Sequence, residues 1–188
     1  MEMSDNISYN DIEKLLPAGY LKTLQIIFLA IGAGIALFLI VVVMLYSTTT
    51  QPQLQPSEET ESILTLAHAA IFVSAFFLSR FIYGMIISGK INPQQSLTHS
   101  PRQNSSENDF NMLLQRIRTA EIARLALLEA PAMFGLVVIL ICVTSGVIFY
   151  EPVYWLNFLS GAVLWGMIYI NFPTKDKLFE TVISYYSK

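Results

Sequence analysis

Four long apolar runs are the feature that most constrains how this sequence can fold. The runs are Thr23–Tyr46, Ile63–Ile87, Leu125–Tyr150 and Pro152–Phe172. A helix needs about 20 mostly apolar residues to cross the hydrocarbon core of a bilayer, and each run meets that length. The runs lack the apolar–polar alternation of barrel strands and exceed their usual length of about ten residues. We therefore expect an all-α membrane protein with four transmembrane helices.

The composition agrees with this class, because 54% of the 188 residues are hydrophobic and only 13% are charged. The single cysteine, Cys142, lies inside an apolar run, so we expect it to pack as a small hydrophobic side chain. The first run follows an acidic head that includes Glu2 and Asp5, which is unlike a secretory signal peptide. The first span is therefore expected to remain in the mature protein.

The basic residues predict the orientation of the spans. Outside the spans, Lys and Arg occur only before the first run, between the second and third, and after the fourth. Because loops rich in Lys and Arg stay in the cytoplasm, we expect both termini there, in a bacterial inner membrane. The expected segments are a cytoplasmic stretch at 1–22, spans at 23–46, 63–87, 125–150 and 151–172, an outer loop at 47–62, a cytoplasmic loop and lead-in helix at 88–124, and an amphipathic cytoplasmic tail at 173–188.

Two amphipathic helices are expected on the cytoplasmic side. The lead-in segment follows a polar loop with His99 and has apolar residues on one helical face: Phe110, Leu113, Leu114 and Ile117. The tail repeats this pattern at Leu178, Val182, Ile183 and Tyr186. A tail of this kind lies on the membrane surface or packs on the lead-in helix, and both arrangements give the same sequence pattern.

Two charged residues lie within the spans, Arg80 in the second and Glu129 in the third. At 1.5 Å per residue, both are roughly 7 to 10 Å from the cytoplasmic ends of their spans. An ionisable side chain in hydrocarbon costs about 2.5 to 3.5 kcal/mol on insertion scales, so it needs a partner or a function. Two arrangements are open: Arg80 pairs with Glu129, or Arg80 extends to the inner headgroups and leaves the acid alone.

Pro131 follows the acid by two residues and removes one helical hydrogen-bond donor, which frees the carbonyl of Leu127 one turn earlier. Some transporters bind cations where the backbone is broken beside a carboxylate. Many spanning helices also bend at proline without any such function. Glu129, Arg80 and Pro131 are therefore the candidate ion-binding residues, and we expect no metal site and no cofactor.

Small residues recur four apart in the first and fourth spans, a spacing that lets helices approach closely. They are Ala30, Gly32, Gly34 and Ala36 in the first span, and Ala162 and Gly166 in the fourth. These positions favour tight packing within the bundle or self-association. The expected partners are therefore the lipid bilayer and either further copies of the chain or a larger membrane complex.

The segment Ala126–Val138, ALLEAPAMFGLVV, resembles the second helix of the proteolipid (c) subunit of rotary ATP synthases. In that family an Ala-Leu-x-Glu-Ala run precedes an aromatic–Gly pair, which Phe134 and Gly135 match here. The resemblance implies that Glu129 carries a proton or a sodium ion. The chain departs from the family in its longer connecting loop, its two additional helices and a second span without repeated glycines.

The overall layout also resembles uncharacterised four-helix proteins of bacterial inner membranes. The sequence has no H-E-x-x-H, Walker, G-x-S-x-G or paired-cysteine motif, so enzymatic activity stays an open question without a catalytic motif to support it. It also has no basic patch with interleaved aromatics, which argues against nucleic-acid binding. Two functions remain: a structural or accessory role in a membrane complex, and, as the alternative, a proton- or cation-translocating subunit that uses Glu129.

Overall fold

The computed structural model describes residues 16–17, 19–52, 59–89 and 105–186, and the regular elements within these ranges are all helical. The elements are α2 (Tyr20–Thr48), α3 (Glu59–Ile87), α4 (Ser105–Ser145), η1 (Val147–Phe149), η2 (Pro152–Phe158), α5 (Leu159–Ile170) and α6 (Lys175–Tyr186). Four stretches are long and apolar enough to cross a membrane, in α2, α3, α4 and the η2–α5 segment. The predicted all-helical class with four such stretches is confirmed. The loop with His99 and most of segment 1–22 lie outside the described residues.

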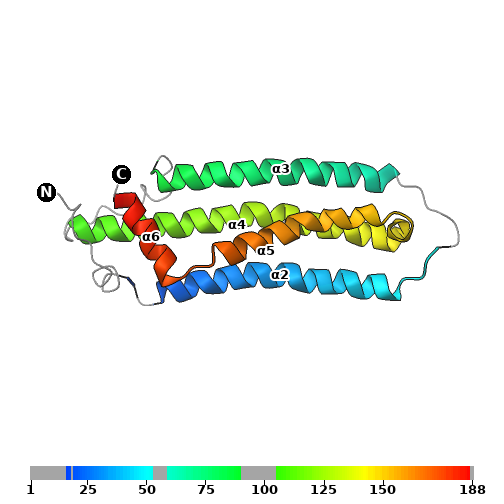
Figure 1. The fold of residues 1–188 in the computed structure, drawn as a ribbon, viewed down its shortest axis with the longest axis horizontal. Coiled ribbons are helices and arrows are strands. Elements are labelled where there is room, and N and C mark those ends of the chain that lie inside the picture. Colours follow the sequence, from blue (N-terminus) through cyan, green and yellow to red (C-terminus); the bar gives the residue numbers. More distant parts are fainter. Residues whose placement is uncertain (1–15, 18, 53–58, 90–104, 187–188) are drawn as a thin grey trace.

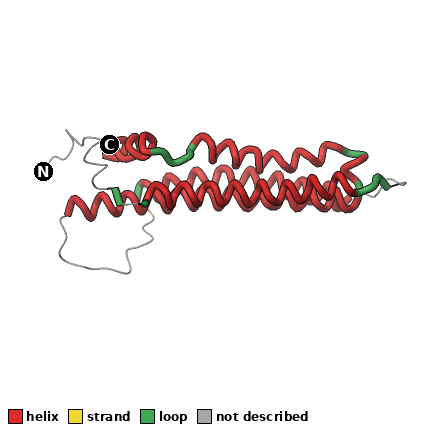
Figure 2. The backbone as a smooth tube through the Cα atoms, turned by 90° about the horizontal axis from the view of Figure 1, so that it is seen from below, coloured by secondary structure: helices red, strands yellow, loops and turns green. Residues whose placement is uncertain are grey.

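Helix α4 is the centre of the bundle. Helices α3 and α2 lie on either side of it in one layer, and α5 and α6 cover one face of that layer (Figures 1 and 2). The bundle has an α6 end, where α2 and α4 begin and α3 ends, and an opposite η end, which holds η1 and η2 (Figure 1). In the most apolar stretch of α4, half of the residues are buried inside the chain. The corresponding share is 17% in α2 and 11% in α3. Most of the surface of α2 and α3 is therefore left for lipid or for another protein.

The main core forms where α4 meets α2 and α5. Its α4 residues recur three or four apart and are fully buried: Leu125, Leu128, Ala132, Leu136, Ile139 and Val143. Helix α2 contributes buried residues seven apart: Phe28, Ile35 and Val42. Trp165 of α5 donates its indole hydrogen to the carbonyl oxygen of Gly32 at 3.1 Å, which joins α5 to α2.

The η end differs from the predicted spans. Helix α4 ends at Ser145, five residues before the predicted end of the third span. Gly146 follows with φ +81°, a left-handed conformation that suits glycine and ends helices. The fourth spanning stretch begins as the 3-10 helix η2, with Pro152 in its first turn, and becomes α-helical at Leu159.

The α6 end carries a second apolar cluster. Phe110, Leu113, Leu114 and Ile117 on the lead-in part of α4 pack against Leu178 and Val182 of α6. The lead-in part and the third span form one uninterrupted helix of 41 residues. Of the two arrangements that the sequence leaves open for the tail, the structure has the one in which the tail packs on the lead-in helix.

Candidate functional site

A buried polar cluster lies between α3, α4 and the η2–α5 segment, and His68 is at its centre. The imidazole is only 4% exposed. Its Nδ1 lies 2.9 Å from Oδ1 of Asn157, and its Nε2 lies 2.9 Å from Oγ of Ser160 and 3.1 Å from the carbonyl oxygen of Pro131. The cluster therefore joins three separate parts of the chain through one side chain.

The hydrogen-bond network determines which imidazole nitrogen carries the proton. Asn157 donates through Nδ2 to Oγ1 of Thr65 at 3.0 Å and to the carbonyl oxygen of Tyr154 at 2.9 Å. Its Oδ1 is then an acceptor, so the Nδ1–H group of His68 donates to it. In the neutral ring, Nε2 accepts the hydroxyl hydrogen of Ser160.

The same cluster can also hold a protonated imidazole. A proton on Nε2 can be donated to the carbonyl oxygen of Pro131 or to Oγ of Ser160. The Ser160 hydroxyl can then turn to the carbonyl oxygen of Asn157 at 3.3 Å. Both charge states of the ring thus find hydrogen-bond partners in the cluster, although burial of the imidazole disfavours its charged form.

Gly135 makes the cluster sterically possible. A Cβ at this position would lie 2.8 Å from Nε2 of His68 and closer still to the carbonyl oxygen of Asn157. Both distances are below any ordinary Cβ contact. Only glycine lets η2 approach α4 this closely. The rings of Phe72 and Phe134 pack around the imidazole, with their centroids 6.3 and 6.0 Å from its centroid.

Ser160, His68 and Asn157 are hydrogen-bonded in the order of a serine nucleophile, its base and an orienting residue. Ser160 and Asn157 are each 1% exposed, however, so no substrate atom can approach the hydroxyl in this conformation. The Ser160 hydroxyl also has backbone acceptors, the carbonyl oxygens of Pro131 and Asn157. The geometry therefore supports an interhelical polar contact and not an open catalytic site.

Arg80 and Glu129 do not pair with each other. Among the described residues the only ion pair joins Arg124 to Glu121, at 2.5 Å. Arg80 is exposed on α3, and its guanidinium lies over the ring of Phe76, 5.0 Å from the centroid. Phe76 is one turn towards the η end, so the side chain of Arg80 also does not extend to the nearer α6 end. Neither arrangement expected for Arg80 is present.

Helical rotation explains why the two charges fail to meet. Arg124 and Phe134 of α4 both face α3, where they contact the rings of Tyr83 and His68. Glu129 is five residues from each of them, and five residues turn an α-helix roughly 140° beyond one full turn. Glu129 therefore lies on another side of α4, half-buried and without a hydrogen-bond or ion-pair partner among the described residues.

Pro131 lies inside α4, which continues through it for 14 further residues to Ser145. Its carbonyl oxygen is the acceptor for His68 and Ser160, so Pro131 belongs to the polar cluster through its own backbone. The predicted contribution of Pro131 was instead a free carbonyl at Leu127, beside the acid. The structure thus places Pro131 with His68, and it places Glu129 on a different side of the helix.

The small residues of the predicted packing faces have different surroundings. Gly32 faces α5, where a Cβ would meet Ile168 at 3.4 Å, and Ala36 is half-buried. Gly34 is exposed, and a Cβ added there would meet nothing within 4 Å. In α5, Ala162 is exposed, and a Cβ on Gly166 would also meet nothing within 4 Å.

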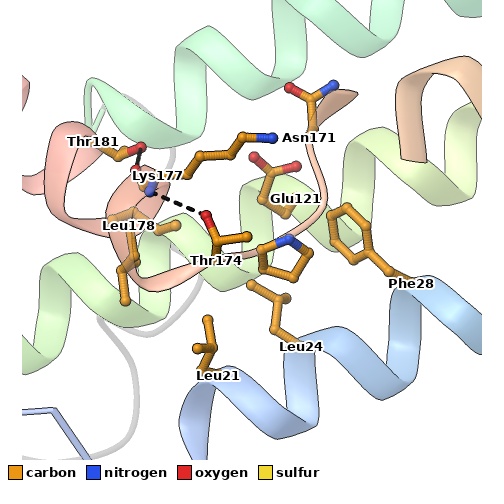
Figure 3. A pocket seen from close by; sticks show the side chains of 11 residues that line it. Leu21, Leu24, Phe28, Glu121, Asn171, Thr174, Lys177, Leu178 and Thr181 are labelled. Atoms are coloured by element: carbon orange, nitrogen blue, oxygen red, sulfur yellow. Dashed lines mark hydrogen bonds between the residues drawn. The ribbon is translucent and has the colours of Figure 1, made fainter. Parts of the chain in front are cut away.

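A second polar group lies at the α6 end, around Glu121. Its carboxylate pairs with Arg124, whose guanidinium lies over the ring of Tyr83, so that the pair connects α4 to α3. Glu121 and Lys177 of α6 line a pocket of about 40 Å³. Figure 3 shows the two side chains beside each other in this pocket. Lys177 donates to the carbonyl oxygen of Ile170 at the end of α5, where the helix dipole favours a cation. The pocket is lined by Leu21, Leu24, Phe28, Ile117, Glu121, Asn171, Pro173, Thr174, Lys177, Leu178 and Thr181.

His68, Asn157 and Ser160 were not predicted from the sequence as site residues. The available signal was a histidine in the second span and two polar residues three apart in the fourth. A lone histidine has no metal-ligand spacing, and the described part of the chain contains no group of three His, Cys, Asp or Glu residues that could hold a metal. Only the fold brings His68 to partners about ninety residues away.

The fold and these sites define the class: an all-helical integral membrane protein whose buried polar side chains connect its helices. Comparison of the chain with models of protein families, with curated proteins and with solved structures finds no match.

Proposed function

We propose that this protein has a structural or accessory role in a membrane complex and works by packing its helices against other membrane helices. We place it in a bacterial inner membrane with the α6 end in the cytoplasm. The distribution of Lys and Arg supports this orientation, because outside the spans they occur only before the first span, between the second and third, and after the fourth. The cluster of lead-in helix and α6 then forms a cytoplasmic extension of the bundle.

The observation that carries this proposal is the exposed position of Arg80 inside a span. Phe77 and Phe81 beside it are 68% and 63% exposed, so the charge lies on an apolar surface that none of the described helices covers. A charged residue facing hydrocarbon costs about 2.5 to 3.5 kcal/mol on insertion scales. A neighbouring protein that supplies a polar or acidic partner removes most of this cost, whereas lipid tails do not.

Spin labels at two matched positions test whether another protein covers this face of α3. Phe77→Cys reports on the α3 face, and Leu37→Cys, 64% exposed and similarly far from the middle of its helix, is the control on α2. In native membranes we expect the spin label at position 77 to be less accessible to oxygen than the label at position 37. The substitution Arg80→Ala should remove this difference, because it removes the charge that holds the partner. Equal accessibility at both positions, unchanged by Arg80→Ala, would contradict the proposal.

A second candidate function is translocation of a proton or cation through Glu129. The observation in its favour is that Glu129 lies within a span and has no partner among the described residues. A carrier carboxyl is expected to react with a hydrophobic carbodiimide and to be protected by sodium or by a rise in pH. This behaviour should persist when Arg80 is replaced by alanine, because a carrier does not depend on that residue.

A further inference from the structure

Arg80 and Glu129 lie at the same level of the bundle although they face different sides. Two contacts set the register of the antiparallel helices α3 and α4: Arg124 with the Tyr83 ring at 5.0 Å, and Phe134 with the His68 ring at 6.0 Å. Glu129 is halfway between these contacts on α4, and the halfway point on α3 falls at residues 75–76. The guanidinium of Arg80 lies over Phe76 and is therefore level with Glu129.

The surfaces around the two charges differ in size. On α3, Arg80 stands between the large exposed side chains of Phe77 and Phe81. On α4, Glu129 stands between the small exposed side chains of Ala126 and Ala130. Large aromatic side chains on one helix can fill the space left by alanines on another, because membrane helices associate through close packing and polar contacts.

From this equal level, opposite charge and opposite surface shape, we infer that Arg80 of one copy pairs with Glu129 of a second copy in the same membrane. Copies of one chain insert with one orientation, and rotation about the membrane normal keeps each residue at its depth. The two charges of neighbouring copies therefore meet without any tilt of the bundle. This inference rests on the proposed function and names the chain itself as the partner that covers the α3 face.

The contact between copies is head to tail. Arg80 and Glu129 lie on different sides of one chain, so each copy offers one charge to each of two neighbours. Such a contact joins different surfaces of the two copies and produces a closed ring or an open row. A symmetric dimer would instead bring the same surface of both copies together, which leaves both Arg80 side chains and both Glu129 side chains without their partners.

Mixing two variants tests this pairing. Purified chains carrying Arg80→Ala or Glu129→Gln are reconstituted separately and together in vesicles, and the number of chains per assembly is counted by single-molecule photobleaching. We expect wild type to form assemblies larger than two and each variant alone to be at least tenfold less associated. In the mixture, Glu129 of the first variant can pair with Arg80 of the second, so we expect assemblies of two and no larger.

The controls remove equivalent charges outside the spans. Arg118→Ala on the lead-in helix and Glu180→Gln on α6, both at exposed positions, should leave the assembly unchanged. Retention of the wild-type helix content by each variant excludes misfolding as the cause of its dissociation, and the recovery of dimers in the mixture shows that both variants remain competent to associate.

A purified wild-type chain that stays monomeric in vesicles would overturn the pairing. Variants that stay as associated as wild type, or a mixture that gives no dimers, would overturn it as well. If position 77 is nonetheless shielded from oxygen in native membranes in any of these cases, the proposed accessory function stands with a different protein as the partner.

Discussion

Gly135 lies against the carbonyl oxygen of Asn157 so closely that no side chain fits between α4 and η2. This contact brings the η2–α5 segment within hydrogen-bonding distance of His68 on α3, so one glycine sets the geometry of the polar cluster. Helix α3 contacts α4 far more than it contacts the η2–α5 segment, so the hydrogen bonds of His68 are among the few links between α3 and that segment.

Replacement of Gly135 by alanine should therefore destabilise the protein. The added methyl group must displace the backbone of η2, and overpacking of this kind costs roughly 1 to 3 kcal/mol. Gly166→Ala is the matched control, because a Cβ there meets nothing within 4 Å, and it should be neutral or slightly stabilising. The free energies of unfolding in mixed detergent micelles measure the difference, and equal values for both variants would count against the close contact.

His68 and Asn157 should be energetically coupled. His68→Leu leaves Oδ1 of Asn157 buried without its donor, and Asn157→Leu leaves Nδ1 of His68 without its acceptor; each change should cost about 1 to 3 kcal/mol. The double variant leaves neither group of this pair unsatisfied, so it should cost less than the sum of the single changes. Additive costs in the same unfolding measurement would show that the hydrogen bond contributes nothing.

The packing of α6 on the lead-in helix should depend on Val182, whose side chain is fully buried. Val182→Asp places a charge in the cluster with Leu114 and should release α6, which hydrogen exchange would detect as faster exchange throughout this helix. Ile183→Asp is the control, because Ile183 is 41% exposed on the same helix. Protection of α6 that survives both substitutions would mean that something other than this cluster holds the helix.

The proposed orientation predicts which end of the bundle can be labelled from outside the cell. Val153→Cys lies exposed at the η end and Asp176→Cys lies exposed on α6, while the native Cys142 is buried and serves as an unreactive reference. A maleimide that cannot cross the membrane should label position 153 in intact cells and position 176 only after the membrane is broken. The opposite pattern would invert the topology.

The four spans could be predicted because a run of about 20 apolar residues carries its own signal. The end of α4 could not be predicted, because the helix ends at the left-handed conformation of Gly146. The apolar run in the sequence continues past that residue and gives no sign of the end. The His68 cluster escaped prediction because its partners are remote in sequence. Residue counts predict similar depths for Arg80 and Glu129, but they cannot predict the sides of the helices that the two residues face, because these depend on helix rotation, which only the packed structure shows.

The most direct test of the central claim, that Arg80 of one copy pairs with Glu129 of another, is carbodiimide labelling of Glu129 in native membranes, with Arg80→Ala alongside. A hydrophobic carbodiimide reacts with protonated carboxyl groups in apolar surroundings, so a carboxylate paired with a neighbour's Arg80 should be protected. We expect no labelling of Glu129 in the wild type and strong labelling in Arg80→Ala. Equal labelling of both proteins, with protection by sodium or by raised pH, would contradict the account and identify Glu129 as an ion carrier.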